Sequence, residues 1–374
     1  MECKFLSNGF ALSYDNIVKP CCEWNVDDVW RSNNKLTDVD LSRWHSSKEI
    51  VKIREDFKQG VWPSNCFRCK HTEDNSDKYS ERQNGNLAYQ SLDNDDITLE
   101  IRPGSVCNFA CQTCWPAASS RVAQYHSKLG LIDITNTNAA NYTDFEFLKP
   151  IANRIKKVTV LGGEPFYDKN CKKFLVWASE NLTADITMFT NGSVVSLDWL
   201  AEFKGNITLV TSMDAVGKPA EYVRFGTVWQ DVVDNFNASR KLVDSARVSI
   251  TTSSYNLHLL EDLIDFLLED WPDVVQFGIA RGESFYTEAV IPEDCRSDII
   301  NSLERAITKM QKSTVEEGQK WNSINALQSV IDRLNSTPYC QDQHAAWKDR
   351  TKKLDAVKGI SASDYCKKLA YMLA

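Results

Sequence analysis

The chain has 374 residues, of which 43% are hydrophobic and 25% are charged, with 43 Lys and Arg against 51 Asp and Glu. These fractions are those of a folded protein and exclude a disordered chain. The net charge of −8 argues against bulk nucleic acid as a partner, because binding it needs clustered Lys and Arg. No apolar run approaches the roughly 18 residues of a membrane span, and Met1 to Phe5 lack the pattern of a signal peptide. We therefore expect a cytoplasmic protein without a membrane partner.

The chain carries twelve cysteines, and their distribution is uneven. Five lie in the first 69 residues, three lie within eight residues of one another, and four are scattered along the rest of the chain. In a reducing compartment these cysteines are not expected to form disulfides. Their clustering is typical of thiolates that share a metal centre, because one turn can direct several sulfurs at one site.

Residues 1–96 are the first of three predicted parts. They contain few periodic stretches and several turn signals, such as Asn8-Gly9 and Trp62-Pro63-Ser64. This part is too irregular to be held together by an apolar core of its own. We therefore expect metal ligation to stabilise it.

Residues 97–290 repeat one pattern, a short β-rich run followed by a polar turn and a helical run. The predicted strands are Ile97–Arg102, Lys157–Leu161, Asp185–Phe189, Ile207–Met213, Arg247–Thr251 and Val274–Ala280. The predicted helices among them are Ser119–Leu129, Cys171–Asn181, Val232–Ser245 and Leu259–Asp270. Such alternation predicts right-handed βαβ units and a parallel sheet. Six units are too few for a closed eight-stranded barrel, so the expected fold is α/β, a partial (β/α)6 TIM-like barrel.

Residues 291–374 are expected to be helical throughout. Amphipathic spacing marks residues 298–310, 325–334 and 346–357, and no motif there carries chemistry. The complete prediction is an irregular N-terminal metal-binding domain at 1–96, the partial barrel at 97–290 and a helical C-terminal extension at 291–374.

A Cys-x3-Cys-x2-Cys loop, formed by Cys107, Cys111 and Cys114, follows the first predicted strand. Three thiolates can hold three irons of a 4Fe-4S cluster and leave the fourth iron open to an external chelator. An electron-carrying cluster normally has four cysteines, and a structural zinc ion has four Cys or His ligands. The spacing could instead mark one face of a helix, but Pro103 and Gly104 favour a loop.

Short polar residues follow the next three predicted strands. Gly162, Gly163, Glu164 and Pro165 follow the second strand, where the glycines allow close backbone approach and Glu164 offers an acceptor for an ammonium group. Asn191 follows the third strand, Ser212 lies at the end of the fourth, and Asp214 follows it. Strand ends of this kind share one face of a barrel, which predicts a small-molecule pocket. Ser212 and Asp214 could instead cap a helix.

These motifs resemble those of radical S-adenosylmethionine (SAM) enzymes, in the same order and at strand ends, over roughly residues 95–290. The resemblance implies that Cys107, Cys111 and Cys114 ligate a 4Fe-4S cluster whose fourth iron is chelated by SAM. Many family members carry an aromatic residue near the adenine, just before the third cysteine, where this chain has Thr113. Phe109 or Trp115 could cover the adenine instead.

The resemblance also implies which side chains contact SAM. These are Gly162, Gly163, Glu164, Pro165, Asn191, Ser212, Asp214 and Arg224. The segment from Gly162 to Pro165 would bind the methionyl amine, and Ser212 and Asp214 would contact the ribose. Arg224 would pair with the methionyl carboxylate, and a structural salt bridge is an equal alternative for it.

The N-terminal cysteines predict a second metal site. They resemble the SPASM/twitch auxiliary-cluster domains of radical SAM enzymes, although those domains usually follow the barrel. The resemblance implies an auxiliary 4Fe-4S cluster on Cys3, Cys21, Cys66 and Cys69, with Cys22 as an alternative to Cys21. A structural zinc ion on the same thiolates is the competing interpretation, because ligand spacing does not separate the two metals.

The activity implied by the resemblance is reductive cleavage of SAM to a 5'-deoxyadenosyl radical that abstracts hydrogen from a substrate. Families with auxiliary clusters frequently modify peptides, so we expect a peptide or protein substrate and a reductant such as flavodoxin or ferredoxin. A small molecule, such as a nucleoside, sugar or cofactor precursor, is the alternative substrate. From a different class, the chain could be a non-catalytic zinc- or cluster-binding interaction protein. Hydrogen abstraction needs no general base, so no catalytic residue is assigned.

Overall fold

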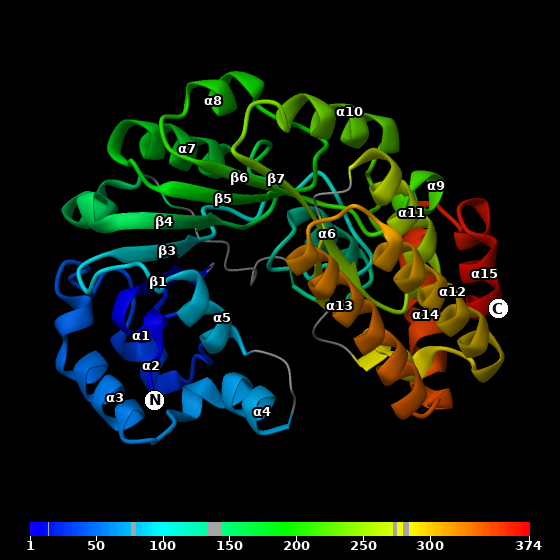
Figure 1. The fold of residues 1–374 in the computed structure, drawn as a ribbon, viewed down its shortest axis with the longest axis horizontal. Helices are drawn as coiled ribbons and strands as arrows, with labels where there is room; N and C mark the ends of the chain where they lie inside the picture. Colours follow the sequence, from blue (N-terminus) through cyan, green and yellow to red (C-terminus); the bar gives the residue numbers. More distant parts are fainter. Residues whose placement is uncertain (14, 76–79, 134–141, 143, 272–274, 280–283) are drawn as a thin grey trace. The chain divides into compact units, whose positions relative to one another are not determined.

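The structure, a computed structural model, describes residues 1–13, 15–75, 80–133, 142, 144–271, 275–279 and 284–374 (Figure 1). The chain divides into two compact units. The first unit comprises Met1–Ser105, Asn138–Met188 and Glu202–Ile207. The second unit comprises Val106–Thr137, Phe189–Ala201 and Thr208–Ala374.

The strands form a mixed sheet in the order β2-β1-β3-β4-β5-β6-β7-β8. Their bounds are β1 Gly9–Leu12, β2 Val18–Lys19, β3 Ile97–Ile101, β4 Ile155–Val160, β5 Asp185–Thr190, β6 Ile207–Ser212, β7 Ser245–Thr252 and β8 Val275–Ile279. Strand β2 runs antiparallel to β1, whereas the pairs β1–β3, β3–β4, β4–β5, β6–β7 and β7–β8 are parallel. From β3 to β8 the spatial order follows the chain order, which successive βα units produce. The predicted α/β fold is therefore confirmed.

The six predicted strands agree with β3 to β8 within two residues at each end. Val274 and Ala280, the predicted ends of the last strand, lie outside the described residues. The predicted helix Val232–Ser245 is too long, because the observed helix ends at Ser239 and β7 begins at Ser245. Leu242, which lies in the part of the predicted range beyond the observed helix, is 41% exposed and contributes little to packing.

The first unit contains a core that the sequence did not predict. Its helices are α1 Lys4–Asn8, α2 Asp28–Asn33, α3 Lys48–Lys58, α4 Phe67–Asn75, α5 Glu81–Ala88 and α7 Lys169–Asn181. All four residues of β1 are buried, and the rings of Phe10 and Trp44 lie 4.8 Å apart between centroids. Trp24 packs on Trp30 in the same way, at 4.6 Å. The expectation that residues 1–96 lack an apolar core is therefore wrong, because short strands and dispersed tryptophans give no periodic signal.

Polar side chains fix where the helices of the first unit begin. The Ser47 side chain accepts a hydrogen bond from the backbone N–H of Ile50 at the start of α3. At the start of α5, Ser80 and Gln83 form a reciprocal capping box. Such caps satisfy backbone donors that have no partner within the helix.

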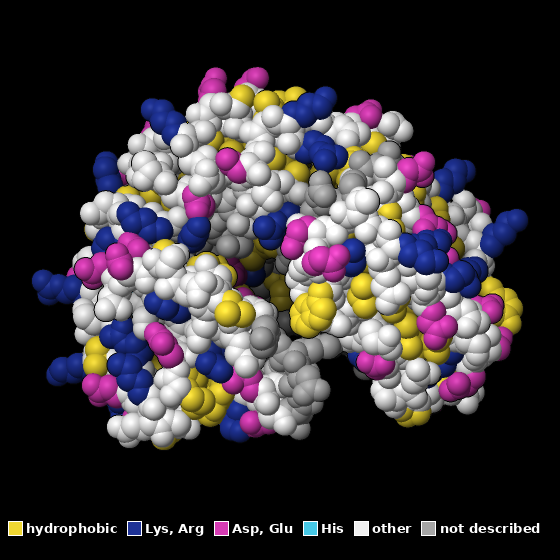
Figure 2. Space-filling model, in the orientation of Figure 1, with side chains coloured by type: hydrophobic (Ala, Val, Ile, Leu, Met, Phe, Trp, Pro, Cys, Tyr) yellow, Lys and Arg dark blue, Asp and Glu magenta, His cyan; other side chains and the backbone are white. Residues whose placement is uncertain are grey.

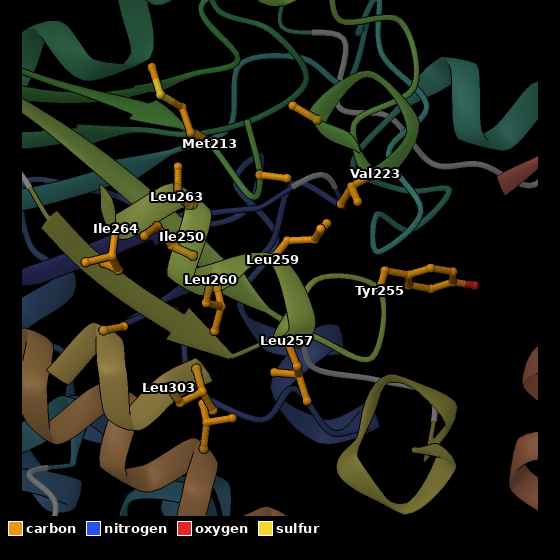
Figure 3. Close-up of a cluster of buried hydrophobic side chains, with 14 of the residues drawn as sticks. Met213, Val223, Ile250, Tyr255, Leu257, Leu259, Leu260, Leu263, Ile264 and Leu303 are labelled. Atoms are coloured by element: carbon orange, nitrogen blue, oxygen red, sulfur yellow. The ribbon is translucent and has the colours of Figure 1, made fainter. Parts of the chain in front are cut away.

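The second unit is largely helical after β8, as predicted. Its helices are α6 Ser120–Lys128, α8 Leu197–Glu202, α9 Gly217–Val223, α10 Trp229–Ser239, α11 Leu260–Asp270, α12 Glu293–Lys312, α13 Glu317–Ser336, α14 Gln341–Lys358 and α15 Lys367–Leu373. Residue Glu202 at the end of α8 belongs to the first unit. Figure 3 shows Leu260, Leu263 and Ile264 of α11 gathered near Ile250 of β7, and all four side chains are fully buried. Helix α12 packs against α11 and α13, so the C-terminal helices extend one continuous core.

Side chains of both charge signs are interspersed over the face of the molecule that Figure 2 shows. Within the described residues, no helix has both the length and the apolar character needed to cross a membrane.

Candidate functional site

The three-cysteine loop belongs to the second unit and is not helical. Its backbone pairs with the segment after α9, because the N–H of Ala110 donates to the carbonyl of Phe225 at 2.7 Å and the N–H of Gln112 donates to the carbonyl of Val223 at 2.8 Å. The alternative that the cysteine spacing marks a helix face is therefore wrong. These hydrogen bonds fix the course of the loop between its cysteines.

Side chains from three helical elements hold the carbonyl groups of the same loop. Arg121 of α6 donates to the carbonyl of Asn108, and Lys358 of α14 donates to the carbonyl of Ala110 at 3.0 Å. The hydroxyl of Tyr286, in the 3-10 turn Ser284–Tyr286, donates to the carbonyl of Gln112 at 3.3 Å. Backbone groups of a loop need such partners when they are shielded from water. Sequence reasoning missed Lys358, Arg121 and Tyr286, because contacts that depend on tertiary packing leave no local spacing pattern.

The sulfurs of the loop lie close enough to influence one another. Burial raises the pKa of the Cys114 thiol, and the neighbouring sulfurs of Cys111 and Cys107 raise it further. Burial also raises the pKa of Cys111. The N–H of Phe109 donates to the sulfur of Cys107 at 3.4 Å. Three partly buried thiols of this kind become thiolates when positive charge is supplied, and a bound metal centre supplies it.

Asn191, one of the predicted site residues, directly follows β5 and lies against this loop. Its side-chain amide donates to the side-chain oxygen of Asn108 at 2.9 Å and lies 3.8 Å from the sulfur of Cys107. Asn108 in turn donates to the hydroxyl of Ser193 at 2.8 Å. The structure therefore brings Asn191 and the first cysteine together.

Asp214 and Arg224 form a buried ion pair, with 2.9 Å between the guanidinium and the carboxylate. The second carboxylate oxygen of Asp214 accepts from the N–H of Thr251 at 2.8 Å. Burial opposes the charge of Arg224, but the Cys111 sulfur and the Asp214 carboxylate raise its pKa. The structural salt bridge, which the sequence analysis gave as an alternative role for Arg224, is thus present. Ser212, the last residue of β6, is half-buried and precedes Asp214 by two residues in the chain.

One atom of this arrangement has no partner. The Nε of Arg224 is buried without a hydrogen-bond acceptor among the described residues. A buried donor without an acceptor costs free energy, so the site favours an additional acceptor or anion near Cys111. The residues present therefore fit a thiolate-bound cluster and a carboxylate-bearing cofactor.

Of the two aromatic side chains considered for the adenine, Phe109 is 1% exposed and packed in the protein, whereas Trp115 is 61% exposed.

The segment from Gly162 to Pro165 follows β4 in the first unit. Gly162 has φ +140°, and a Cβ atom there would lie 2.5 Å from the carbonyl oxygen of Gly104. The N–H of Gly163 donates to the same oxygen at 3.0 Å. Only glycine permits this approach and this backbone angle. The carboxylate side chain of Glu164 is fully buried behind the turn and accepts from the N–H of Phe166 at 3.4 Å.

Four of the five N-terminal cysteines share one small cavity of about 20 Å³ in the first unit. The residues lining it are Cys3, Cys21, Cys66, Cys69, Phe5, Leu6, Pro20, Trp24, Phe57, Trp62 and Arg82. Burial raises the pKa of Cys3 to about 11, and the sulfur of Cys69 contributes in the same direction. Burial raises the pKa of Cys66 to about 12, with contributions from the sulfurs of Cys3 and Cys69. The same four cysteines that the resemblance selects are therefore neighbours.

Cys22, the alternative to Cys21, does not line this cavity. After burial, the groups that most raise its pKa are the carboxylates of Glu100 and Glu81. By contrast, the pKa of Cys21 is raised by burial and then by the sulfurs of Cys3, Cys66 and Cys69. Among the described residues, no group of three or more Cys, His, Asp or Glu side chains meets the geometry of a single bound metal ion.

Comparisons with known proteins add to this picture. No protein-family model matches the chain. The GTP 3',8-cyclase of Campylobacter fetus subsp. fetus (strain 82-40) is 25% identical over 177 residues, which are 46% of this chain and 52% of the cyclase. The chain thus spans about half the length of this curated relative.

Among solved structures, anSMEcpe with bound AdoMet has a TM-score of 0.41 and 18% identity, covering 58% of this chain and 64% of that one. Streptococcus suis SuiB bound to S-adenosylmethionine has a TM-score of 0.39 and 15% identity, covering 72% and 59%. TYW1 with a lysine-pyruvate adduct bound has a TM-score of 0.37 and 15% identity, covering 72% and 90%. These proteins are radical SAM enzymes. Radical SAM enzymes are the class that the sequence motifs of this chain resemble, whereas a SPASM domain is not shown by these comparisons.

Proposed function

We propose that this chain is a radical SAM enzyme whose 4Fe-4S cluster is held by Cys107, Cys111 and Cys114. Support comes above all from the cysteine loop, where three electrostatically coupled sulfurs lie on a non-helical backbone fixed at successive residues. When bound, the cluster and SAM supply a 5'-deoxyadenosyl radical that abstracts a hydrogen atom from the substrate.

The residues of the chain bind and orient these groups. Arg224 carries a buried positive charge beside the cysteine sulfurs and offsets the negative charge of thiolates, while Asp214 keeps its guanidinium in place. Asn191 steadies the loop through Asn108. We assign SAM binding to Gly162, Gly163, Glu164, Pro165, Asn191, Ser212, Asp214 and Arg224.

Anaerobic reconstitution with iron and sulfide, followed by dithionite and SAM, tests this proposal. The expected product is 5'-deoxyadenosine, detected by liquid chromatography and mass spectrometry. Cys107→Ala should abolish the product, whereas Cys295→Ala, a half-buried cysteine outside the loop, should not. A fully loaded protein that releases no 5'-deoxyadenosine would show that the chain is a non-catalytic metal-binding protein.

We further propose a second, auxiliary 4Fe-4S cluster on Cys3, Cys21, Cys66 and Cys69 in an N-terminal SPASM/twitch-like domain, residues 1–96, with zinc as the alternative. The shared cavity and the mutual influence of the sulfurs support it. Iron and zinc analysis of a Cys107→Ala, Cys111→Ala, Cys114→Ala triple variant separates the two metals. About four irons per chain would support the auxiliary cluster, whereas one zinc ion per chain would show that the site holds zinc instead.

The substrate that we propose is a peptide or protein, with electrons supplied by a flavodoxin or ferredoxin in the cytoplasm. A small molecule is the second candidate, and the sequence match to a GTP 3',8-cyclase favours it. Incubating the loaded enzyme with candidate substrates and measuring substrate-dependent 5'-deoxyadenosine distinguishes the two classes.

A further inference from the structure

Three basic side chains gather in the second unit around the cysteine loop. Arg350 and Lys358 come from α14, and Arg121 comes from α6. Burial lowers the pKa of Lys358 to about 8, and the charges of Arg350 and Arg121 contribute to this shift. His126 lies in the same region, since Arg350 reaches its ring nitrogen at 3.5 Å. Like charges so close together raise the free energy of the folded protein.

Two acidic groups face Lys358, the carboxylate of Asp355 and the sulfur of Cys111. The oxygens of Asp355 already accept from the hydroxyl of Tyr222 at 3.1 and 3.0 Å. Within the part of the chain that the structure describes, no carboxylate forms an ion pair with Arg350 or Arg121. Partly buried cations are normally paired, so this region carries an excess of positive charge that an anion would offset.

The side chains that surround Arg350 leave its guanidinium group able to bind an anion. Its guanidinium lies 3.2 Å from the hydroxyl of Tyr286 and 3.5 Å from that of Tyr255. The rings of Phe285 and Tyr286 lie 4.9 and 5.6 Å from its central carbon. Hydroxyl groups and ring faces hold the guanidinium without neutralising it, and its planar N–H groups match an oxyanion.

These residues also lie where a ligand is expected. Tyr255 lies three residues after the end of β7, so its contact with Arg350 places that guanidinium near the carboxyl end of a parallel strand. Ligands of parallel sheets bind at such ends. Tyr286 further links Arg350 to the carbonyl of Gln112 within the cysteine loop.

We propose that Arg350, Arg121 and Lys358 form a binding site for an oxyanion of the substrate. The inference rests on the proposed function, since it names the substrate class of the same site. Arg350 and Arg121, which have no carboxylate in an ion pair among the described residues, match a phosphate dianion better than a carboxylate monoanion, because the dianion offsets both charges.

The site is tested by isothermal titration calorimetry on anaerobically reconstituted enzyme with saturating SAM. Inorganic phosphate and acetate are the probes, and ionic strength is kept constant with sodium chloride. We expect phosphate to bind and Arg350→Met to weaken it about tenfold or more, because a charge-assisted hydrogen-bonded pair is lost. Arg350→Lys should bind more tightly than Arg350→Met. Tighter binding of acetate than of phosphate would identify a carboxylate substrate at the same site.

Lys353→Gln is the matched control, because Lys353 lies on the same helix but is exposed and pairs with Asp349. It should leave phosphate binding within twofold of the wild type. Arg121→Gln provides a second variant if circular dichroism shows that Arg350→Met does not fold, and it too should weaken binding. Absence of phosphate and acetate binding, or equal binding by all variants, overturns the proposal. Failure of the proposed function is a separate outcome, in which phosphate binds but no 5'-deoxyadenosine forms.

Discussion

The side-chain ammonium group of Lys358, the last residue of α14, donates a hydrogen bond of 3.0 Å to the carbonyl oxygen of Ala110, between the first two cysteines of the loop. It also donates to the side-chain oxygen of Gln112 at 3.1 Å. A single lysine from the C-terminal helices thus contacts both sides of Cys111. The C-terminal part therefore takes part in the architecture of the site.

Lys358→Met should lower the free energy of unfolding by about 2 kcal/mol, because two acceptors and Asp355 lose a buried cation. Urea unfolding monitored by circular dichroism measures the change. Lys353→Met, on the exposed face of the same helix, should change stability by less than about 0.5 kcal/mol. Equal effects of the two substitutions would show that Lys358 does not hold the loop.

Asp214→Asn should destabilise the protein by about 3 kcal/mol or more, because Arg224 keeps a buried charge without its counter-ion. The double variant Asp214→Asn, Arg224→Met should lose less than the sum of the two single variants, since it removes both charges. A double-mutant cycle of unfolding free energies gives this coupling. Strict additivity would contradict the buried ion pair.

Gly162→Ala should destabilise the turn by about 2 kcal/mol or more, because the new methyl group meets the carbonyl oxygen of Gly104 at a backbone angle that alanine avoids. The thermal unfolding midpoint measures the effect. The control is Gly278→Ala in β8, where the nearest atom lies 3.8 Å from the added Cβ. This substitution should cost markedly less.

Protonation of His45 should lower the free energy of unfolding as the pH falls. Burial lowers its pKa from 6.5 to about 4, although a hydrogen bond to the carbonyl of Gly9 at 3.0 Å acts in the opposite direction. Because His45 binds its proton more tightly in the unfolded chain, the contribution of neutral His45 to the free energy of unfolding is complete above pH 6.5. This contribution is lost as the pH falls towards 4. The full contribution is about 3 kcal/mol.

Unfolding free energies measured at pH 7 and pH 5 test this expectation. His45→Gln should reduce the pH dependence relative to the wild-type protein. A pH dependence that is identical in the two proteins would exclude His45 as its source.

Cys21→Ala should lower the metal content of the N-terminal site, whereas Cys22→Ala should not. The two cysteines are adjacent in sequence, but Cys21 alone of the pair lines the shared cavity. Metal analysis of both variants in the background without the loop cysteines measures the difference. The reverse result would make Cys22 the ligand.

The sequence by itself determined strands β3 to β8, their parallel alternation with helices and the non-helical cysteine loop. These features depend on local patterns: strands of five to eight residues carry β-branched and apolar side chains, and Pro103 and Gly104 interrupt any helix before Cys107. The choice of Cys21 beside Cys22 needed the tertiary structure, because the two share one local environment in sequence but face different neighbours.

Only the tertiary structure brought Lys358 and Arg350 to the cysteine loop and its surroundings. Contacts between residues more than 200 positions apart depend on how helices pack, and a lysine or arginine on an amphipathic helix carries no sign of its partner. The same is true of the apolar core of residues 1–96, where tryptophans that are dispersed along the chain meet in space. Local patterns therefore determined most of the elements and the candidate metal-binding cysteines, whereas packing decided which charges surround them.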